Sequence, residues 1–330
     1  VALAPDMPYD GAEGGGCFSG SAIEFNGKYW LVYTGVGYDD KIGKFVQTQC
    51  VAYSDDGIAF TKYADNPVIA LEKGLPAGSR PTDFRDPKVW EHDGYVYMIV
   101  SAGNEADEFA RLLLYRTQNM TEWQCVGTAY STSAETQSQS GTMMECPDLF
   151  RLDGTDVIIA CSMNIPKHRN GNGCVYFTGK LDYETGKLLR ADNSAVREVD
   201  GGFDFYAPQT MLHPDGRRIL IAWMHGFGKT IGSLLGYRYA SSQTFPRELH
   251  VENGTLRQLP VREIENYYRS AVVVKKLVNG DRLFVSELDG TCMNLSLEFA
   301  PSEGAGITVF ADKNGKGLQI YYSDGKVYLN

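Results

Sequence analysis

Short apolar segments, each entered through a tight glycine turn, recur along this chain of 330 residues. Four of them start with Asn-Gly or Asp-Gly and continue as apolar and aromatic runs, at 26–35, 93–103, 153–163 and 215–224. Asn-Gly and Asp-Gly favour the left-handed turns that join antiparallel strands. The pattern therefore predicts a series of β-hairpins.

A second strand precedes each of these turns and completes a repeating unit. The preceding strands lie at 17–25, 83–92, 144–152 and 203–212. The turn glycines at 27, 94, 154 and 216 are separated by 67, 60 and 62 residues. Such a unit is typical of a four-stranded propeller blade with long loops, whose first strand lines the central channel. We expect an all-β protein built as a β-propeller.

The pattern changes after about residue 265. The segment 261–270 is expected to form a short helical or irregular link. Closely spaced alternating runs then predict the start of a β-sandwich. These runs are AVVVKKLV (271–278), RLFVSEL (282–288), MNLSLEF (293–299), GITVFAD (306–312), LQIYYSD (318–324) and KVYLN (326–330). We predict a propeller domain at 1–265 and a partial sandwich domain at 266–330.

Composition and charge exclude several classes of partner. The apolar share of 43% and the charged share of 22% are those of a soluble globular protein. The formal charge of −10, with no cluster of Lys and Arg, argues against binding to nucleic acid or to anionic membranes. No apolar run approaches the roughly 18 residues that span a bilayer.

The seven cysteines are odd in number and scattered, and no CxxC occurs. This usage favours free thiols in a reducing compartment over disulfides, and hence a cytoplasmic location. The five histidines are isolated and form no zinc-binding pattern. We expect no metal and no organic cofactor.

The stretch TMMECPDLF (142–150) places the acid Glu145 among apolar residues. Arg85 and Asp86 fall at the same point of the preceding unit, so both acids are expected to project from innermost strands toward the axis. Two carboxylates that meet in a pocket are what glycoside hydrolysis requires. The alternative is that Asp-Pro and Glu-Cys-Pro only form turns or mark strand edges. Their common phase favours the pocket.

With these motifs in place, the chain resembles glycoside hydrolase family 32, the family of invertases, sucrose-6-phosphate hydrolases, levanases and inulinases. The resemblance runs in order to about residue 265, with weaker motifs beyond. It is carried by ALAPD (2–6), CFSGSA (17–22), YTG (33–35), QTQCVAYSDDGIAFTKYADNPVI (47–69), FRDPKVW (84–90), ECPDLF (145–150), FYAPQT (205–210), RRILIAWM (217–224) and FPRELH (245–250).

The resemblance implies a five-bladed propeller with a C-terminal sandwich, and retaining cleavage of terminal β-fructosyl bonds. It assigns Glu145 as acid/base and Asp86, with Arg85 beside it, as the residue that holds fructose hydroxyls and stabilises the transition state. It places four further residues at or near the sugar: Phe18, Ser19, Tyr206 and Trp223. For Trp223 ordinary core packing, and for Ser19 a turn contact, are equal alternatives.

The expected electrostatics fit that chemistry. A carboxyl group packed near Met143, Met144 and Cys146 is desolvated, which favours the neutral form that a general acid needs. We expect Arg85 to offset this effect for Asp86 and to keep it ionised. The transition state resembles an oxocarbenium ion, so surrounding negative charge stabilises it.

One family motif is absent. The family's nucleophile is the Asp of an NDPNG motif in the first blade, and no NDP occurs in this sequence. By the family pattern, the chain opens at the end of the first blade, and the four repeats are blades two to five. The context of Asp6 and Asp10 gives no reason to assign either as nucleophile. We expect the sequence to be part of a longer protein; the alternatives are a truncated gene, and a first blade from another copy or chain.

Other functions stay open. An inverting, arabinanase-like five-bladed glycosidase also brings acids to its axis, and a catalytically dead fructan-binding propeller would lack the nucleophile. The choice among sucrose, sucrose 6-phosphate, inulin and levan depends on contacts beyond the first fructose. The acidic charge leans against a phosphorylated sugar. The expected partners are sucrose or fructan substrates, with a homo-oligomer as an open option.

Overall fold

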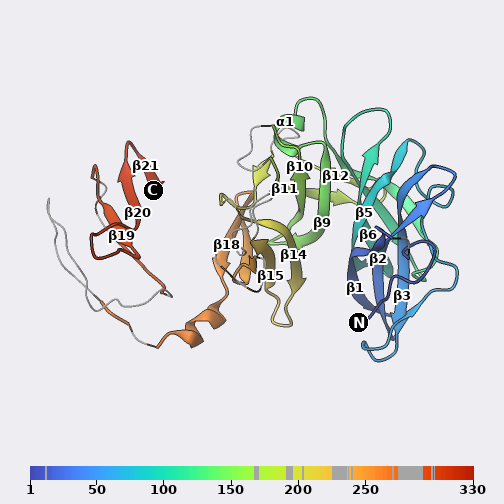
Figure 1. The fold of residues 1–330 in the computed structure, drawn as a ribbon, viewed down its shortest axis with the longest axis horizontal. Coiled ribbons are helices and arrows are strands. Elements are labelled where there is room, and N and C mark those ends of the chain that lie inside the picture. The colour runs from blue at the N-terminus through green and yellow to red at the C-terminus, as the bar shows by residue number, and fades with distance from the viewer. Residues whose placement is uncertain are drawn as a thin grey trace. The chain divides into compact units, whose positions relative to one another are not determined.

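The chain folds almost entirely into antiparallel β-strands, which confirms the predicted all-β class (Figure 1). The computed structural model describes residues 1–11, 13–166, 171–190, 196–202, 204–224, 236, 238, 241–269, 271–273, 293–298, 300 and 302–330. The chain divides into two units, Val1–Arg262 and Glu263–Asn330, which are described separately. No helix in these described ranges is both long and apolar enough to cross a membrane.

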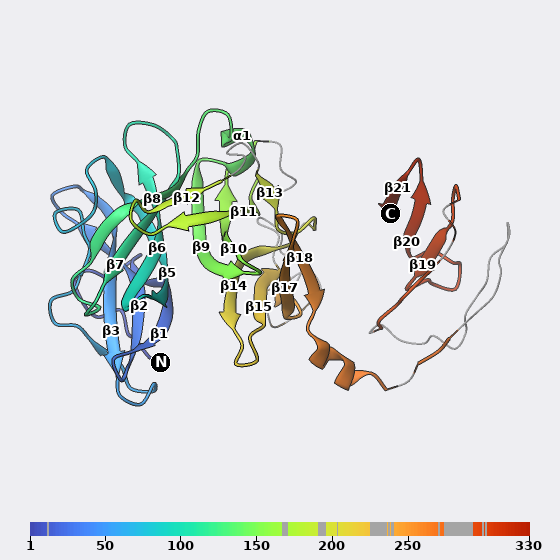
Figure 2. The same cartoon turned by 180° about the vertical axis from the view of Figure 1, so that it is seen from behind.

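Four sheets form the first unit, and they stand side by side as blades (Figure 2). They carry the numbers two to five that the expected family pattern gives them. Blade two contains β1 (Gly16–Phe25), β2 (Lys28–Asp39), β3 (Lys44–Ser54) and β4 (Thr61–Lys62). Blade three contains β5 (Ser79–His92), β6 (Tyr95–Asn104), β7 (Arg111–Thr117) and β8 (Gln124–Ser131). The short helix α1 (Gln137–Ser140) leads into blade four.

Blades four and five each add one short strand to the four-stranded pattern. Blade four contains β9 (Met143–Leu152), β10 (Thr155–Met163), β11 (Gly173–Asp182), β12 (Lys187–Leu189) and β13 (Arg197–Glu198). Blade five contains β14 (Tyr206–Leu212), β15 (Arg218–Met224), β16 (Ser242–Gln243), β17 (Arg247–Glu252) and β18 (Thr255–Pro260). The predicted repeat of strand, turn and strand is therefore confirmed in all four sheets.

The glycine turns behave as predicted in three of the four hairpins. Both residues have positive φ angles in Asn26-Gly27, Asp93-Gly94 and Asp153-Gly154, which is the geometry of the type I′ turn. The fourth turn is longer: the main-chain N–H of His213 donates to the carbonyl of Arg217 over 2.8 Å. Asp215 there accepts from the Arg217 side chain instead of occupying the left-handed region.

The apolar core lies between neighbouring blades, because the middle strands are buried on both faces. In β6 the alternate residues Val96, Met98 and Val100 pack toward blade two. Tyr97 and Ile99, between them in sequence, pack toward blade four. This arrangement explains why the central strands read as continuous apolar runs rather than as alternating ones. A third cluster joins blades four and five in the same way.

The innermost strand of each blade leaves its regular register at the same point. The shift follows Phe18 in β1, Arg85 in β5, Glu145 in β9 and Tyr206 in β14. Such a β-bulge bends the strand and redirects a side chain, and bulges are common beside active sites. These four residues therefore occupy equivalent positions in the four blades.

In three of these strands the residue after the shift has a positive φ angle and precedes a proline. The angles are 65° for Asp86, 47° for Cys146 and 49° for Ala207. Positive φ is uncommon for residues other than glycine, and proline removes one donor from the strand ladder. The same local backbone conformation therefore occurs three times, in the sequences Arg-Asp-Pro, Glu-Cys-Pro and Tyr-Ala-Pro.

A buried ion pair joins the inner strands just beyond the bulges. Lys88 Nζ on β5 lies 3.5 Å from Asp148 Oδ2 on β9, and it donates to the carbonyl of Thr210 on β14 over 2.8 Å. The main-chain N–H of Thr210 donates to the same Asp148 oxygen over 2.7 Å. One lysine and one aspartate therefore connect three blades near the axis.

Lys88→Met is expected to lower the free energy of unfolding by about 3 kcal/mol, because the buried Asp148 would lose the cation that lies 3.5 Å from it. Denaturant unfolding measures this change. The matched control is Lys28→Met, which removes an exposed pair with Asp55 and should cost about 1 kcal/mol or less. Equal losses in the two variants would contradict the role given to Lys88.

The second unit begins within a 3-10 helix (Arg262–Tyr267), where a helical or irregular link was predicted. Its described sheet has the order β19 (Gly306–Val309), β20 (Leu318–Ser323) and β21 (Lys326–Leu329). The last three predicted strands are confirmed. The strand predicted at 293–299 is wrong for its described residues, 293–298, which form no strand. The predicted strand at 282–288, and most of that at 271–278, lie outside the described residues.

Candidate active site

Glu145 lies at the bulge of β9 and is held by the equivalent residues of the two neighbouring blades. Its Oε1 atom accepts hydrogen bonds from Arg85 Nε over 3.0 Å and from Arg85 Nη2 over 2.8 Å. Its Oε2 atom accepts from the Tyr206 hydroxyl over 2.6 Å. The three bulges thus bring an arginine, a glutamate and a tyrosine into one hydrogen-bonded group.

Asp86 lies next to this group and is buried, with 8% of its surface exposed. Its Oδ2 atom accepts from the main-chain N–H of Cys146 over 2.9 Å and faces the Cys146 thiol at 3.6 Å. Burial raises the pKa of Asp86, although the Cys146 hydrogen bond and the Arg85 charge act in the opposite direction. Asp86 is therefore a desolvated carboxyl group that lies beside Glu145.

The expected effect of Arg85 on Asp86 is present but incomplete: the Arg85 charge lowers the pKa of Asp86, and burial outweighs it. Arg85 Nε lies 4.0 Å from Asp86 Oδ2, whereas two of its nitrogens contact Glu145. Burial lowers the pKa of Arg85, but Glu145, Asp86 and Asp83 together raise it, with Glu145 as the largest of the three. Arg85 is thus a permanent cation whose charge is directed mainly at Glu145.

The Tyr206 hydroxyl acts as a fixed donor. Burial, followed by nearby cysteines and Glu145, raises its pKa far above the ordinary tyrosine value. A phenol that keeps its proton can donate to a carboxylate but cannot repel it as an anion. Burial also raises the pKa of the Cys146 thiol, with the Asp86 charge as the next cause, so Cys146 stays neutral beside Asp86.

Two glutamines of blade two hold the bulge that carries Arg85. The Gln47 Oε1 atom accepts from the main-chain N–H of Phe84 over 2.7 Å and from Arg85 Nη1 over 3.2 Å. The Gln49 Nε2 atom donates to the Phe84 carbonyl over 2.8 Å. The main-chain N–H of Asp86 donates to Thr34 Oγ1 over 3.0 Å. Side chains of the neighbouring blade therefore replace the ladder bonds that the bulge removes.

Phe18 and Ser19 lie at the bulge of β1, which is attached to β5 through a hydrogen bond from the Val89 N–H to Ser21 Oγ of 3.0 Å. Phe18 is 44% exposed. Within the described part of the chain, no hydrogen bond links either residue to Glu145 or Asp86. Their predicted contact with a sugar remains a prediction.

Trp223 lies directly opposite Tyr206 in the register of β14 and β15. It is partly buried against the core cluster between blades four and five, and its ring nitrogen donates to Ser241 Oγ. The indole therefore supports the strand that presents Tyr206. This position fits the packing alternative at least as well as a sugar contact.

The assembled group holds more negative than positive groups. Arg85 faces Glu145 and the neighbouring Asp83, whose Oδ1 atom accepts from Arg85 Nη1 over 3.1 Å. Asp86 adds a third carboxyl group. An excess of carboxyl groups over cations in a partly desolvated place stabilises developing positive charge. The arrangement can therefore transfer a proton at Glu145 and stabilise a cationic reaction centre beside Asp86.

Sequence reasoning missed the direct bond between Tyr206 and Glu145 and the clamp formed by Gln47 and Gln49. A signal for the first was present. Tyr206 lies two residues before Pro208, as Glu145 lies two residues before Pro147. The glutamines carried no such signal, because their partner is a main-chain segment of another blade.

Known proteins resemble this chain over most of its length. Residues 1–260 match the model of the glycosyl hydrolases family 32 N-terminal domain. The sucrose-6-phosphate hydrolase of Bacillus subtilis is 37% identical over 276 residues, which cover 82% of this chain and 54% of that protein. The chain thus spans about half the length of the curated relatives it matches.

Solved structures show the same fold. A family 32 β-fructofuranosidase of Bombyx mori, also solved as a mutant in complex with sucrose, is 30% identical with a TM-score of 0.68. The match covers 78% of this chain and 53% of that one. The sucrose-6-phosphate hydrolase of Lactobacillus gasseri is 27% identical with a TM-score of 0.69, over 80% of this chain and 52% of that one.

Proposed function

Because the chain belongs to glycoside hydrolase family 32, we propose that the protein hydrolyses terminal β-fructofuranosyl bonds of sucrose or of fructans, with retention of configuration. The observation that carries the proposal is the group around Glu145. A carboxyl group held by Arg85 and Tyr206 lies beside the buried Asp86, at the bulges of adjacent inner strands. Relatives named sucrose-6-phosphate hydrolase and raffinose invertase support the substrate class.

In this mechanism Glu145 is the general acid and then the general base. Its proton passes to the glycosidic oxygen as the bond to the fructosyl carbon breaks. Glu145, then a carboxylate, accepts a proton from the water that releases fructose. Arg85 and Tyr206 fix the two carboxyl oxygens by donating to them. They also stabilise the ionised form that exists between the two steps.

Asp86 accepts hydroxyl groups of the fructosyl ring and stabilises its positive charge. Its fixed partner, the Cys146 N–H, leaves the other carboxylate oxygen for a substrate. The retaining route also needs a carboxylate nucleophile. No residue among positions 1–330 is assigned to that role, so the proposal concerns the whole protein to which this chain belongs.

The test is product analysis with the full-length protein and sucrose, sucrose 6-phosphate and inulin as substrates. We expect fructose from at least one of them, together with glucose from sucrose or glucose 6-phosphate from sucrose 6-phosphate. Free fructose interconverts between its anomers in water, so methanol is added as an alternative acceptor whose product keeps its configuration. Methyl β-fructofuranoside would support retention. The α-anomer would support an inverting enzyme, and binding of fructan without any product would support a non-catalytic propeller.

A further inference from the structure

Two cysteines lie face to face beneath the candidate active site. Cys161 on β10 and Cys174 on β11 are directly opposite each other in the strand register, and their Sγ atoms are 2.9 Å apart. A disulfide bond measures about 2.05 Å and joins Cα atoms about 4.4–6.8 Å apart. Opposed residues of antiparallel strands have Cα atoms about 4.5–5.5 Å apart. The pair can therefore form a bond without a change of strand register.

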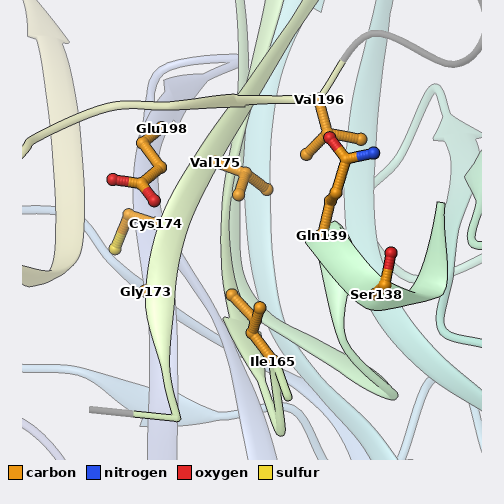
Figure 3. Close-up of a pocket in the computed structure, with 8 residues that line it drawn as sticks. All are labelled: Ser138, Gln139, Ile165, Gly173, Cys174, Val175, Val196 and Glu198. Carbon is orange, nitrogen blue, oxygen red and sulfur yellow. The ribbon is translucent and has the colours of Figure 1, made fainter. Parts of the chain in front are cut away.

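A cavity lies beside one of the two cysteines. It has a volume of about 190 Å³, and Cys174 lines it together with Ile165, Gln139, Val196 and Glu198. Figure 3 shows Cys174 beside Glu198, with its sulfur atom directed away from Val175 and from the α1 residue Gln139. A water molecule occupies about 30 Å³, so hydrogen peroxide fits in this space. Cys161 is fully buried, and burial raises the pKa of its thiol.

The same two sulfur atoms hold the main chain on both sides of Tyr206. Cys161 Sγ accepts from the N–H of Ala207 over 3.1 Å. Cys174 Sγ donates to the carbonyl of Phe205 over 3.7 Å. Tyr206, between these residues, donates to Glu145 over 2.6 Å. A change at the thiol pair is therefore transmitted to the acid through a single residue.

We propose that Cys161 and Cys174 form a reversible oxidation site, in which a hydroperoxide converts the dithiol into a disulfide that displaces Tyr206. Cys174 attacks one peroxide oxygen, the O–O bond breaks, and the thiol proton leaves with the other oxygen as water. The Cys161 sulfur then attacks the Cys174 sulfenic acid, the S–O bond breaks, and a second water carries away the Cys161 proton. Two thiols are oxidised and one molecule of hydrogen peroxide is reduced.

The effect on activity rests on the proposed function. Bond formation closes the sulfur separation from 2.9 Å to about 2.05 Å and removes the thiol donor to Phe205. Misplacement of a catalytic group by about 1 Å can cost about a hundredfold in rate. Since Tyr206 donates to Glu145, we expect kcat to fall about tenfold and KM to change little.

The first test is chemical. The full-length protein is treated with hydrogen peroxide, alkylated without reduction, digested and mapped by mass spectrometry. We expect peptides that contain Cys161 and Cys174 to be joined, and separated again by dithiothreitol. A Cys174 that stops at sulfinic acid while Cys161 stays reduced would overturn the proposal. This readout does not depend on catalysis, so it stands even if no fructosyl substrate is cleaved.

The second test follows kcat before and after peroxide in the parent and two variants. The parent should lose activity and regain it with dithiothreitol. Cys174→Ala should show no reversible loss, whereas a loss that persists in this variant would place the oxidised group elsewhere and overturn the coupling. Cys125→Ala, which changes a half-buried thiol of β8, is the matched control and should behave as the parent. Joined cysteines with an unchanged kcat would also overturn the coupling.

Discussion

Replacement of Glu145 by Gln is expected to reduce kcat for fructose release by about a thousandfold while the fold is retained. The amide has the size of the carboxyl group but can neither donate the proton to the leaving oxygen nor accept one from water. It also carries only one acceptor oxygen, so when that oxygen faces Arg85 the Tyr206 hydroxyl must turn from donor to acceptor of the amide N–H. Steady-state kinetics on sucrose or inulin, with circular dichroism to verify the fold, measure the effect.

A substrate with a good leaving group makes this prediction sharper. An aryl β-fructofuranoside needs little protonation, so the Glu145→Gln variant should form its fructosyl intermediate at a rate much closer to that of the parent. The matched control is Glu252→Gln, which alters an exposed glutamate paired with Arg257 and should leave kcat unchanged. A Glu145→Gln variant that kept most of its rate on sucrose would remove Glu145 from the role of acid/base.

Asp86→Asn is expected to reduce kcat/KM by about a hundredfold or more, because the variant lacks the charge that stabilises the oxocarbenium-like transition state. The amide oxygen can still accept from Cys146, so the bulge should persist. Asp55→Asn is the control, since Asp55 is exposed and pairs only with Lys28 among the contacts described for it. Kinetics with the cleaved substrate provide the measurement.

The pKa of Asp86 gives this prediction a second readout. Burial raises that pKa, so the ionised form is lost at a higher pH than for an ordinary aspartate as the solution is acidified. The parent should lose activity there, and the Asn variant should lack this step. A carboxylate with a raised pKa also disfavours the folded state at neutral pH. The Asn variant should therefore be at least as stable as the parent; a less stable variant would indicate a structural role.

Much of the fold could be predicted because its determinants are local. Asn26-Gly27 and Asp93-Gly94 specify tight left-handed turns by their own chemistry. The strands beside these turns are apolar on both faces, which indicates that both faces are buried. The exception at His213–Arg217 has a local cause as well, since Asp215 is bound by the Arg217 side chain. The strand predicted at 293–299 had only alternation in its favour, which a short segment can show without pairing.

The candidate site was less predictable because its contacts cross blades. Glu145 and Asp86 could be found from their common phase, but the partner of Arg85 depends on where the bulge of β5 directs its side chain. Its effect on the neighbouring Asp86 was expected, but its hydrogen bonds to Glu145 were not. Gln49 illustrates the same limit, since its amide holds a carbonyl 35 positions away in sequence.

The repeated bulge keeps the backbone the same in three blades while the side chains differ. In each of the three proline motifs, the residue two places before the proline contributes a side chain to the group around Glu145: Arg85, Glu145 itself or Tyr206. The residue next to the proline has a positive φ angle in all three, and in one of them, Asp86, it also lies beside this group. The same local backbone therefore presents three different side chains. A propeller of this kind can acquire a new reaction by exchanging single residues, and its blades need not change to accommodate them.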